Sequence, residues 1–252
     1  MTKKVFITGA TSGFGKAIAE IYARHGHDCI ITGRREERLD ELQKELEQKF
    51  NVAIFTLCFD IRNKEAVNKA IGTLPPEWND IDILINNAGL ALGRDYFDEA
   101  DMDDWETMLD TNVKGLLYVT RALLPSMTKR NKGHIINIGS TAAKEVYEKG
   151  NVYCASKAAV DSISQSMRID LLRHGIKVTA IHPGAAETEF SKVRFKGDEE
   201  TAKSVYKGFK PLVAEDVASI VYYCTTLPDH VCINDLVLTC TAQANSFYFH
   251  RQ

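Results

Sequence analysis

The stretch Val5-Phe-Ile-Thr-Gly-Ala-Thr-Ser-Gly-Phe-Gly-Lys16 decides the fold. A short apolar run leads into Gly9, Gly13 and Gly15, spaced G-x-x-x-G-x-G, and helical spacing of apolar residues follows over 16–25. The pattern predicts a buried strand, a tight turn and a helix. Such a turn can simply connect a strand to a helix, but glycines also let a ligand approach the backbone. The free N–H groups and positive dipole of the helix then suit a pyrophosphate, and the strand–turn–helix context favours this binding interpretation.

Short apolar runs alternate with helix-length segments along the whole chain. We expect strands over 5–8, 29–32, 52–58, 81–85, 134–138, 177–181 and 236–239, and helices over 16–25, 36–49, 64–74, 105–120, 152–172 and 215–226. This rhythm, with continuous apolar strands, implies a parallel sheet covered on both faces. The prediction is α/β: one Rossmann-like, doubly wound domain over 1–252 with about seven strands. The polar segment 185–211 lacks strand periodicity, and we expect either a substrate lid or a helical excursion without a role in chemistry.

Composition excludes several classes of protein. The chain has 252 residues, 44% of them apolar, and a formal net charge of -3, which gives no reason to expect nucleic acid or an anionic membrane as a partner. No apolar run approaches the ~18–20 residues that span a bilayer. The N-terminal nine residues do not resemble a signal peptide, and the six cysteines form no CxxC pair. We therefore expect a cytoplasmic protein with reduced thiols and no metal site.

The end of the second expected strand, Thr32-Gly-Arg-Arg35, bears on the choice of dinucleotide. An acidic residue here pairs with the ribose 2′-OH of NAD, whereas an arginine accommodates the 2′-phosphate of NADP. Arg34 and Arg35 therefore predict NADP. They could instead belong to a solvated helix start, but cations are disfavoured at a helix N-terminus, so their placement indicates an anion nearby.

Two further strand ends carry polar or small residues. Asp60 could accept a hydrogen bond from an adenine amino group, or it could cap the helix expected near Asn63. The run Asn86-Asn-Ala-Gly89 suits a backbone pressed against a ligand, although it also suits a plain turn.

Tyr153 and Lys157 stand four residues apart in an expected helix, so they share one face. A positive charge beside a phenol favours the phenolate and makes the pair a candidate acid/base device. The spacing alone is common on surface helices. Cys154 falls on another face of that helix and is expected to pack rather than react.

Ser140 and Asn112 complete the candidate set. Ser140 follows the strand over 134–138, at the sheet edge where open α/β sheets bind ligands, though it could be only a cap. Asn112 lies in a helical pattern where asparagine has poor propensity, and the alternative is a surface residue in a frayed turn.

Together these motifs, in this order and spacing over nearly the whole chain, resemble those of the short-chain dehydrogenases/reductases. The resemblance implies that Tyr153 is the general acid/base, that Lys157 lowers its pKa and holds the nicotinamide ribose, and that Ser140 hydrogen-bonds the substrate oxygen. It further implies that Asn112 holds a water that relays protons, and that the protein is a homotetramer. The residues then expected to bind NADP are Gly9, Thr11, Ser12, Gly13, Phe14, Gly15, Arg34, Arg35, Asp60, Ile61, Asn87, Ala88, Gly89, Tyr153, Lys157, Pro183, Gly184 and Thr188.

The stretches 81–93, 133–141 and 188–198 are similar to a narrower group, the bacterial NADP-dependent 3-hydroxy acid dehydrogenases. This group acts on serine, L-allo-threonine and related 3-hydroxy acids, and is implicated in the reduction of malonic semialdehyde. An acid substrate needs a cationic partner, and an arginine can bind a carboxylate bidentately. The candidate is Arg194, with Lys192 second, although a solvated basic loop is the alternative. Glu187 would discourage an anionic substrate if its carboxylate faced the nicotinamide.

Two other functions stay open. One is a carbonyl reductase that acts on lipophilic ketones, and the other is a non-catalytic NADP-binding protein, against which the intact Ser140, Tyr153 and Lys157 argue. The C-terminal run 247–252 contains aromatic residues that could pack in a subunit interface or fold back on their own subunit.

Overall fold

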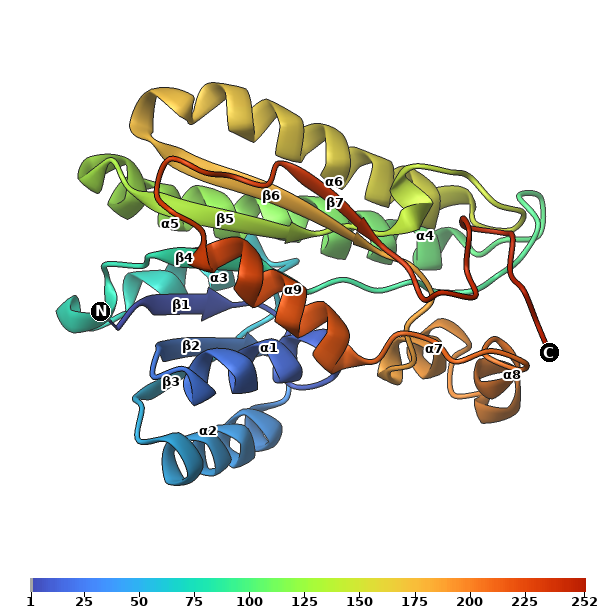
Figure 1. Ribbon diagram of the computed structural model, residues 1–252, viewed down its shortest axis with the longest axis horizontal. Coiled ribbons are helices and arrows are strands. Elements are labelled where there is room, and N and C mark those ends of the chain that lie inside the picture. The colour runs from blue at the N-terminus through green and yellow to red at the C-terminus, as the bar shows by residue number, and fades with distance from the viewer. Residues whose placement is uncertain (1) are drawn as a thin grey trace.

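A single parallel sheet runs through the protein (Figure 1). The computed structural model describes residues 2–252. The strand order is β3-β2-β1-β4-β5-β6-β7, and every neighbouring pair is parallel. The order reverses between β1 and β4, the topological switch point at which doubly wound folds bind ligands. The predicted α/β fold is confirmed. The strands are β1 Lys4–Ile7, β2 Asp28–Gly33, β3 Ile54–Cys58, β4 Ile83–Asn86, β5 Gly133–Ile138, β6 Ile176–Pro183 and β7 Asp235–Leu238.

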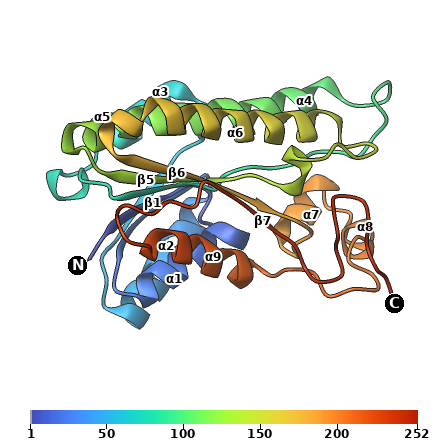
Figure 2. The same cartoon turned by 45° about the horizontal axis from the view of Figure 1, so that its top comes forward.

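Helices cover both faces of the sheet (Figure 2). One face carries α1 Gly13–Arg24, α2 Glu36–Phe50 and α9 Ala214–Thr226, and the other carries α3 Lys64–Gly72, α4 Met102–Leu109, α5 Leu116–Arg130 and α6 Asn151–Asp170. Within 2–252 no helix is both long and apolar enough to cross a membrane.

The strands are apolar on both faces because each face has its own core. In β1, Val5 and Ile7 pack into the cluster beneath α1, α2 and α9, while Phe6 between them packs into the cluster beneath α3 and α5. Successive side chains of a strand point to opposite faces, so a strand buried on both sides reads as a continuous apolar run. All three side chains are fully buried.

The expected helix over 105–120 is part of a longer, interrupted one. Helix α4 passes into a π-helical segment, Asp110–Gly115, and then into α5. Single π turns within a helix are often found at functional sites. This one places Asn112 in the interior rather than on the surface.

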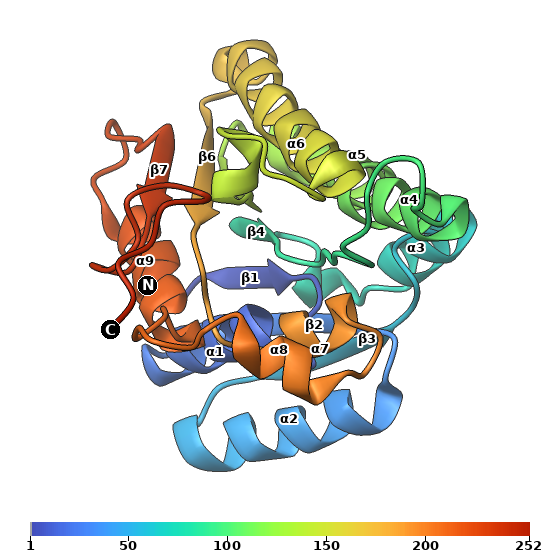
Figure 3. The same cartoon turned by 90° about the vertical axis from the view of Figure 1, so that its right-hand side faces the viewer.

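The segment 185–211 is helical rather than irregular. It contains α7 Glu189–Arg194 and α8 Glu199–Ser204, which lie beyond the carboxyl ends of the strands together with the C-terminus (Figure 1, Figure 3). This position suits a lid over the switch point.

The C-terminal tail folds back onto this lid. The backbone N–H of Gln252 donates to Gly208 O at 2.8 Å, and the ring of Phe249 lies 5.0 Å from that of Phe209. Phe247 and Tyr248 are 63% and 69% exposed. The sequence left open whether the aromatic residues of the tail pack in a subunit interface or fold back on their own subunit. Phe249 folds back on its own subunit.

Candidate active site

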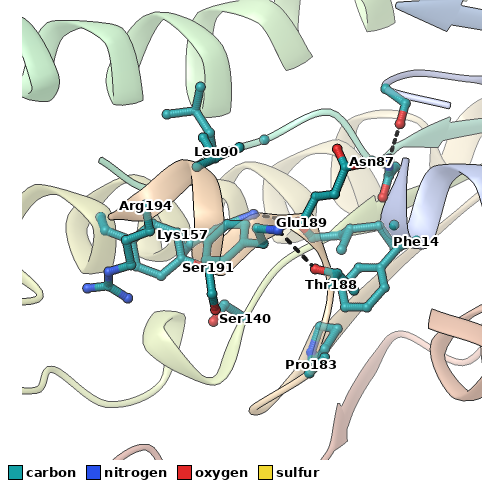
Figure 4. Close-up of a pocket in the computed structure, with 18 of the residues that line it drawn as sticks. Phe14, Asn87, Leu90, Ser140, Lys157, Pro183, Thr188, Glu189, Ser191 and Arg194 are labelled. Atoms are coloured by element: carbon teal, nitrogen blue, oxygen red, sulfur yellow. Dashed lines mark hydrogen bonds between the residues drawn. The ribbon is translucent and has the colours of Figure 1, made fainter. Parts of the chain in front are cut away.

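One cavity of about 680 Å³ joins almost all of the predicted site residues. The glycine turn after β1 lines one part of it, and Ser140, Tyr153 and Lys157 line another. In Figure 4, Ser140, Lys157 and Arg194 lie to one side, and Phe14, Asn87 and Thr188 to the other. The volume falls within the range of small-molecule and cofactor sites.

The glycine turn is shaped by close backbone approach. Gly9 and Gly13 have φ of +67° and +51°, which disfavours other residues. A Cβ on Gly15 would lie 2.2 Å from Gly9 O and 2.6 Å from Asn87 Nδ2. Gly15 does not line the cavity, so its role is to pack the start of α1 against the turn, and its predicted contact with a cofactor is not supported.

The end of β4 holds this turn in place. Asn87 Nδ2 donates to Thr8 O at 2.8 Å and to Gly9 O at 3.2 Å, while Thr8 Oγ1 accepts from the backbone N–H groups of Asn87 and Ala88 at 3.0 Å each. Asn87, Ala88 and Gly89 all line the cavity.

The N-terminus of α1 is free to bind an anion. Its N-cap, Ser12, makes no side-chain capping bond, and the first turn of α1 contains no acidic residue. The unpaired N–H groups and helix dipole therefore face the cavity beside Thr11, Ser12, Gly13 and Phe14. These residues fit the pyrophosphate of a dinucleotide.

Arg35 lies over the glycine turn. Its Nη2 donates to Thr11 Oγ1 at 2.7 Å and to Ser12 Oγ at 3.1 Å. Its Nη1 lies 3.3 Å from Glu189 Oε2, across the cavity on the lid. Arg34 points elsewhere, and its Nη1 is 3.8 Å from Asp60 Oδ2. Both arginines line the cavity, at the place where NADP carries its extra phosphate in dinucleotide folds.

Asp60 is held by arginines. Arg62 Nη2 donates to Asp60 Oδ2 at 2.6 Å. Partial burial acts to raise the pKa of Asp60, but the Arg62 and Arg34 guanidinium groups outweigh it and hold the pKa below its usual range. Asn63, whose Oδ1 accepts from the Ala66 N–H at 2.9 Å, is the N-cap of α3. The alternative that Asp60 caps this helix is therefore wrong. Asp60 lines the cavity, as does its neighbour in the predicted set, Ile61.

Tyr153 lies near the start of α6 and is 8% exposed. Burial, followed by the neighbouring Tyr147, raises the pKa of its phenol, while the Ser140 hydroxyl and the Arg194 guanidinium act to lower it. The phenol is therefore protonated at neutral pH.

Lys157 is also buried, at 6% exposure, and its Nζ donates to Ile138 O at 2.9 Å. Burial lowers its pKa to about 8. In this structure the ammonium is directed to the end of β5. The Ser140 hydroxyl and the Arg194 guanidinium act to lower the pKa of Tyr153, and the role of Lys157 toward that phenol stays a prediction.

Asn112 is 2% exposed and anchors the backbone beside Lys157. Its Oδ1 accepts from the Leu90 N–H at 2.8 Å, and its Nδ2 donates to Leu90 O at 2.8 Å and to Ser156 Oγ at 3.0 Å. A Cβ on Gly89 would lie 3.2 Å from Asn112 Oδ1 and 3.4 Å from Lys157 Nζ. Asn112 is thus neither a surface residue nor part of the cavity wall.

Ser140 both caps a short helix and faces the cavity. Its Oγ accepts from the Ala142 N–H at 3.1 Å, at the start of the 3₁₀ turn Thr141–Ala143. The fully buried His182 supports its backbone, with Nδ1 3.2 Å from Ser140 O. The other side of the imidazole faces Asp161 and Asp235, whose second oxygens pair with Lys144 at 2.9 and 2.6 Å. Lys144 therefore forms ion pairs with both carboxylates that face His182.

The loop after β6 closes the cavity next to the lid. A Cβ on Gly184 would lie 2.1 Å from Gln243 Oε1, which accepts from the Ala185 N–H at 2.8 Å. Thr188 is the N-cap of α7, and its Oγ1 accepts from the Phe190 N–H at 3.2 Å. Pro183, Gly184 and Thr188 all line the cavity, as predicted.

The three charged residues of the segment 185–211 that the sequence singled out differ in their position relative to the cavity. Arg194 lines the cavity, and its Nη1 donates to the Tyr147 hydroxyl at 2.9 Å. Lys192 lies outside the cavity and pairs with Glu199 at 2.8 Å, so it is not a substrate ligand here. Glu187 is exposed and also lies outside this cavity, so its carboxylate does not face the catalytic set.

Several lining residues were not predicted from the sequence as site residues. They come from the loop before α6, the lid and the C-terminal tail: Tyr147, Glu148, Phe190, Tyr206, Gln243, Phe249 and Arg251. Their spacing follows no motif, because tertiary contacts bring them to the cavity. Glu189 lies next to the predicted Thr188, but its partners are more than 150 residues away in sequence.

The fold and the site together define a short-chain dehydrogenase, and residues 3–199 match the short chain dehydrogenase family. The chain belongs to this family. It is 49% identical over 250 residues to the NADP-dependent 3-hydroxy acid dehydrogenase YdfG of Escherichia coli (strain K12), a match that covers 98% of this chain and 99% of the relative. It is 45% identical over 249 residues to sulfoacetaldehyde reductase 2 of Chromohalobacter salexigens, covering 98% of each. The closed form of a serine dehydrogenase complexed with NADP+ is 49% identical and superposes with a TM-score of 0.92, covering 99% of this chain and 100% of that one.

Proposed function

We propose that the protein is an NADP-dependent oxidoreductase that interconverts small 3-hydroxy acids and the corresponding carbonyl acids. The observation that carries this is the placement of Arg194, a cation, with its Cζ 5.5 Å from the Tyr153 ring centroid, within the cavity that the glycine turn also lines. The proposed acid/base residue, Tyr153, and the proposed anion-binding residue, Arg194, thus line the same cavity. L-Serine, L-allo-threonine and 3-hydroxypropionate have the matching chemistry, a hydroxyl and an acid group close together.

NADP, when bound, supplies or accepts the hydride at its nicotinamide. The α1 N-terminus and the glycine turn would hold its pyrophosphate, and Arg35 with Arg34 its 2′-phosphate. Asp60, Ile61 and the run 87–89 would line the adenosine side. Pro183, Gly184 and Thr188 would hold the nicotinamide side, together with Tyr153 and Lys157.

The protein moves the proton. In the direction of reduction, the Tyr153 hydroxyl donates its proton to the substrate oxygen, and in oxidation the same oxygen accepts it. Ser140 hydrogen-bonds that oxygen and stabilises the charge that develops on it. Lys157 replenishes the proton through a water held near Asn112, whose buried amide keeps the adjoining backbone in place.

Arg194 binds the acid group of the substrate. Its Nε donates to Gly93 O and its Nη1 to Tyr147, while among residues 2–252 nothing accepts a bond from Nη2. A guanidinium with a free donor in a partly apolar cavity suits a carboxylate or sulfonate. The relatives named above are described as enzymes of 3-hydroxy acids, serine and sulfoacetaldehyde, and each of these compounds carries such a group.

A second candidate is the reduction of lipophilic ketones or aldehydes. Leu90, Phe190 and Val193 line the cavity and offer apolar surface, and Leu90 and Phe190 pack in one cluster with Tyr153. This would accommodate a hydrocarbon substituent that Arg194 does not bind.

A substrate panel tests the proposal. NADP-coupled rates are measured on L-serine, L-allo-threonine, 3-hydroxypropionate, 3-hydroxyisobutyrate, sulfoacetaldehyde and a hydrophobic ketone. We expect the highest kcat/KM on a substrate that bears an acid group. A preference for the hydrophobic ketone would support the second candidate, and binding of NADPH without turnover of any carbonyl compound would indicate a non-catalytic protein.

The family resemblance also underlies the proposal of a homotetramer, while the scattered cysteines and the N-terminal sequence underlie that of a cytoplasmic location. Sedimentation equilibrium of the purified protein tests the assembly, and cell fractionation tests the location.

A further inference from the structure

Glu189, the first residue of lid helix α7, bridges the cavity to α2. Its Oε1 accepts from Arg38 Nη1 at 3.0 Å, and its Oε2 accepts from Arg38 Nη1 at 3.2 Å and from Arg35 Nη1 at 3.3 Å. All three side chains are a little under half exposed, and Glu189 and Arg35 line the same cavity. The contact therefore joins the lid to the arginine proposed to read the 2′-phosphate.

The carboxylate is ionised at neutral pH. Partial burial acts to raise the pKa of Glu189, but the guanidinium groups of Arg38 and Arg35 outweigh it and hold the pKa below its usual range. An anion thus already lies against the two arginines. A phosphate monoester, with a charge of roughly -1.5 to -2 at pH 7, seeks the same N–H donors and would be repelled by a carboxylate that stayed beside it.

We propose that Glu189 occupies the place of the 2′-phosphate in the free enzyme and makes the release of the lid depend on that phosphate. NADP(H) displaces the Glu189 carboxylate from Arg35 and Arg38, whereas NAD(H) leaves the ion pairs intact. Glu189 is thus a specificity residue that acts through the arginines rather than a catalytic residue. The inference rests on the proposed function, in particular on Arg35 as a ligand of the 2′-phosphate.

Helix α7 also links Glu189 to the proposed substrate end of the cavity. Helix α7 begins at Glu189 and ends at Arg194, the residue over the Tyr153 ring. Release of Glu189 removes the contact at the start of α7, while Arg194 at its other end stays bound to Gly93 O and to the Tyr147 hydroxyl. Recognition of the phosphate is then coupled to the freedom of the first turn of α7.

Direct binding measurements test the competition. Fluorescence titrations give the Kd values of NADPH and NADH for the wild type, for Glu189→Gln and for the matched control Glu187→Gln, which removes an exposed carboxylate outside the cavity. We expect Glu189→Gln to tighten NADPH about 2–5-fold, the range of an exposed ion pair. The Kd of NADH should change by less than about 1.5-fold, and the control should leave both values unchanged. Unchanged or weaker NADPH binding, or equal tightening of NADPH and NADH, overturns the proposal.

Fragments of the cofactor test the coupling to the lid. Hydrogen exchange of peptides covering 189–204 is followed with 2′,5′-ADP and with 5′-ADP, which lacks the 2′-phosphate. We expect 2′,5′-ADP to speed exchange at the start of α7 in the wild type, 5′-ADP to leave it unchanged, and Glu189→Gln to exchange fast without any fragment. Identical responses to the two fragments, or slow exchange in the variant, would overturn the coupling.

The variant Arg35→Gln separates this inference from the function on which it rests. If it leaves the ratio of the NADPH and NADH Kd values unchanged, Arg35 does not read the phosphate, and both its assignment as a phosphate ligand and the inference fall. If Arg35→Gln lowers the preference for NADPH but Glu189→Gln has no effect, only the inference falls.

Discussion

The guanidinium of Arg194 lies over the ring of Tyr153, with 5.5 Å between Cζ and the ring centroid. The cation belongs to α7 and the phenol to α6, so this contact joins the segment 185–211 to the helix that carries Tyr153 and Lys157. A cation at this distance from an aromatic face is attracted to it and favours the phenolate. Under the proposed function, Arg194 would both bind the acid group of the substrate and favour ionisation of the Tyr153 phenol.

The role of Arg194 can be measured by neutralising it. Arg194→Gln removes a charge-assisted hydrogen bond, so we expect the KM for L-serine to rise about tenfold or more while the Kd of NADPH stays within about twofold. Lys192→Gln, which changes a lysine on the outside of the same helix, should leave both constants unchanged. An unchanged KM in Arg194→Gln would exclude it as the substrate ligand.

Tyr153→Phe tests the proton transfer. Removal of the hydroxyl should lower kcat by about 10²–10⁴-fold, because the general acid/base is lost while the ring still packs against Phe190. The Kd of NADPH is the control and should change little. A variant that keeps more than about a tenth of the wild-type kcat would contradict the assignment.

Gly15→Ala tests the packing of the glycine turn. The new Cβ would meet the carbonyl of Gly9 at 2.2 Å, and backbone cannot give way cheaply, so we expect a loss of about 2 kcal/mol or more in the free energy of unfolding. Gly72→Ala, at the end of α3, meets nothing within 4 Å and should be neutral or stabilising by up to about 1 kcal/mol. Denaturant unfolding of the two variants compares them, and equal stabilities would show that the turn relaxes.

His134 makes stability depend on pH. It is buried, its Nε2 lies 2.8 Å from Thr179 Oγ1, and burial, followed by Lys177 and Lys3, lowers its pKa to about 3. Below its ordinary pKa of about 6.5 the unfolded chain binds a proton that the folded protein does not. The free energy of unfolding should therefore fall as the pH falls, by up to about 1.4 kcal/mol per unit between about 6.5 and 3.

The matched variants are His134→Gln and His230→Gln, the latter at an exposed position. Between pH 6.5 and 5.0, the wild type should lose about 1.5 kcal/mol more than His134→Gln in denaturant unfolding, and His230→Gln should behave as the wild type. The same pH dependence in all three proteins would contradict the neutral, buried imidazole.

The C-terminal tail should influence the lid through Arg251. Its guanidinium donates to Val205 O and Lys207 O and lies 5.0 Å from the Phe209 ring centroid. We expect Arg251→Ala to increase proteolysis within 199–211 and to raise the substrate KM a few-fold, with the exposed Tyr248→Ala as the control. Equal protease resistance of the two variants would show that the tail does not hold the lid.

Local patterns in the sequence determined the sheet, the glycine turn and the placement of Tyr153 and Lys157 on one helix. Residues that are apolar on both faces of a strand, or that stand four apart on a helix, are fixed relative to one another by the backbone period alone. Val5 to Ile7, Gly9 with Gly13, and Tyr153 with Lys157 therefore needed no knowledge of distant contacts. The same patterns could not show that Lys157 donates to Ile138 O, since the orientation of a buried ammonium depends on the neighbouring strand.

Only the tertiary structure decided which charged side chains of the segment 185–211 face the cavity. Lys192 and Arg194 are two residues apart, which turns them about 200° from each other on α7, and the packing of that helix chose Arg194 for the cavity. The pairing of Glu189 with Arg35 joins residues 154 apart in the chain. A helical period fixes which residues share a face but not where that face points, and the direction is set by the contacts of the helix with the rest of the fold.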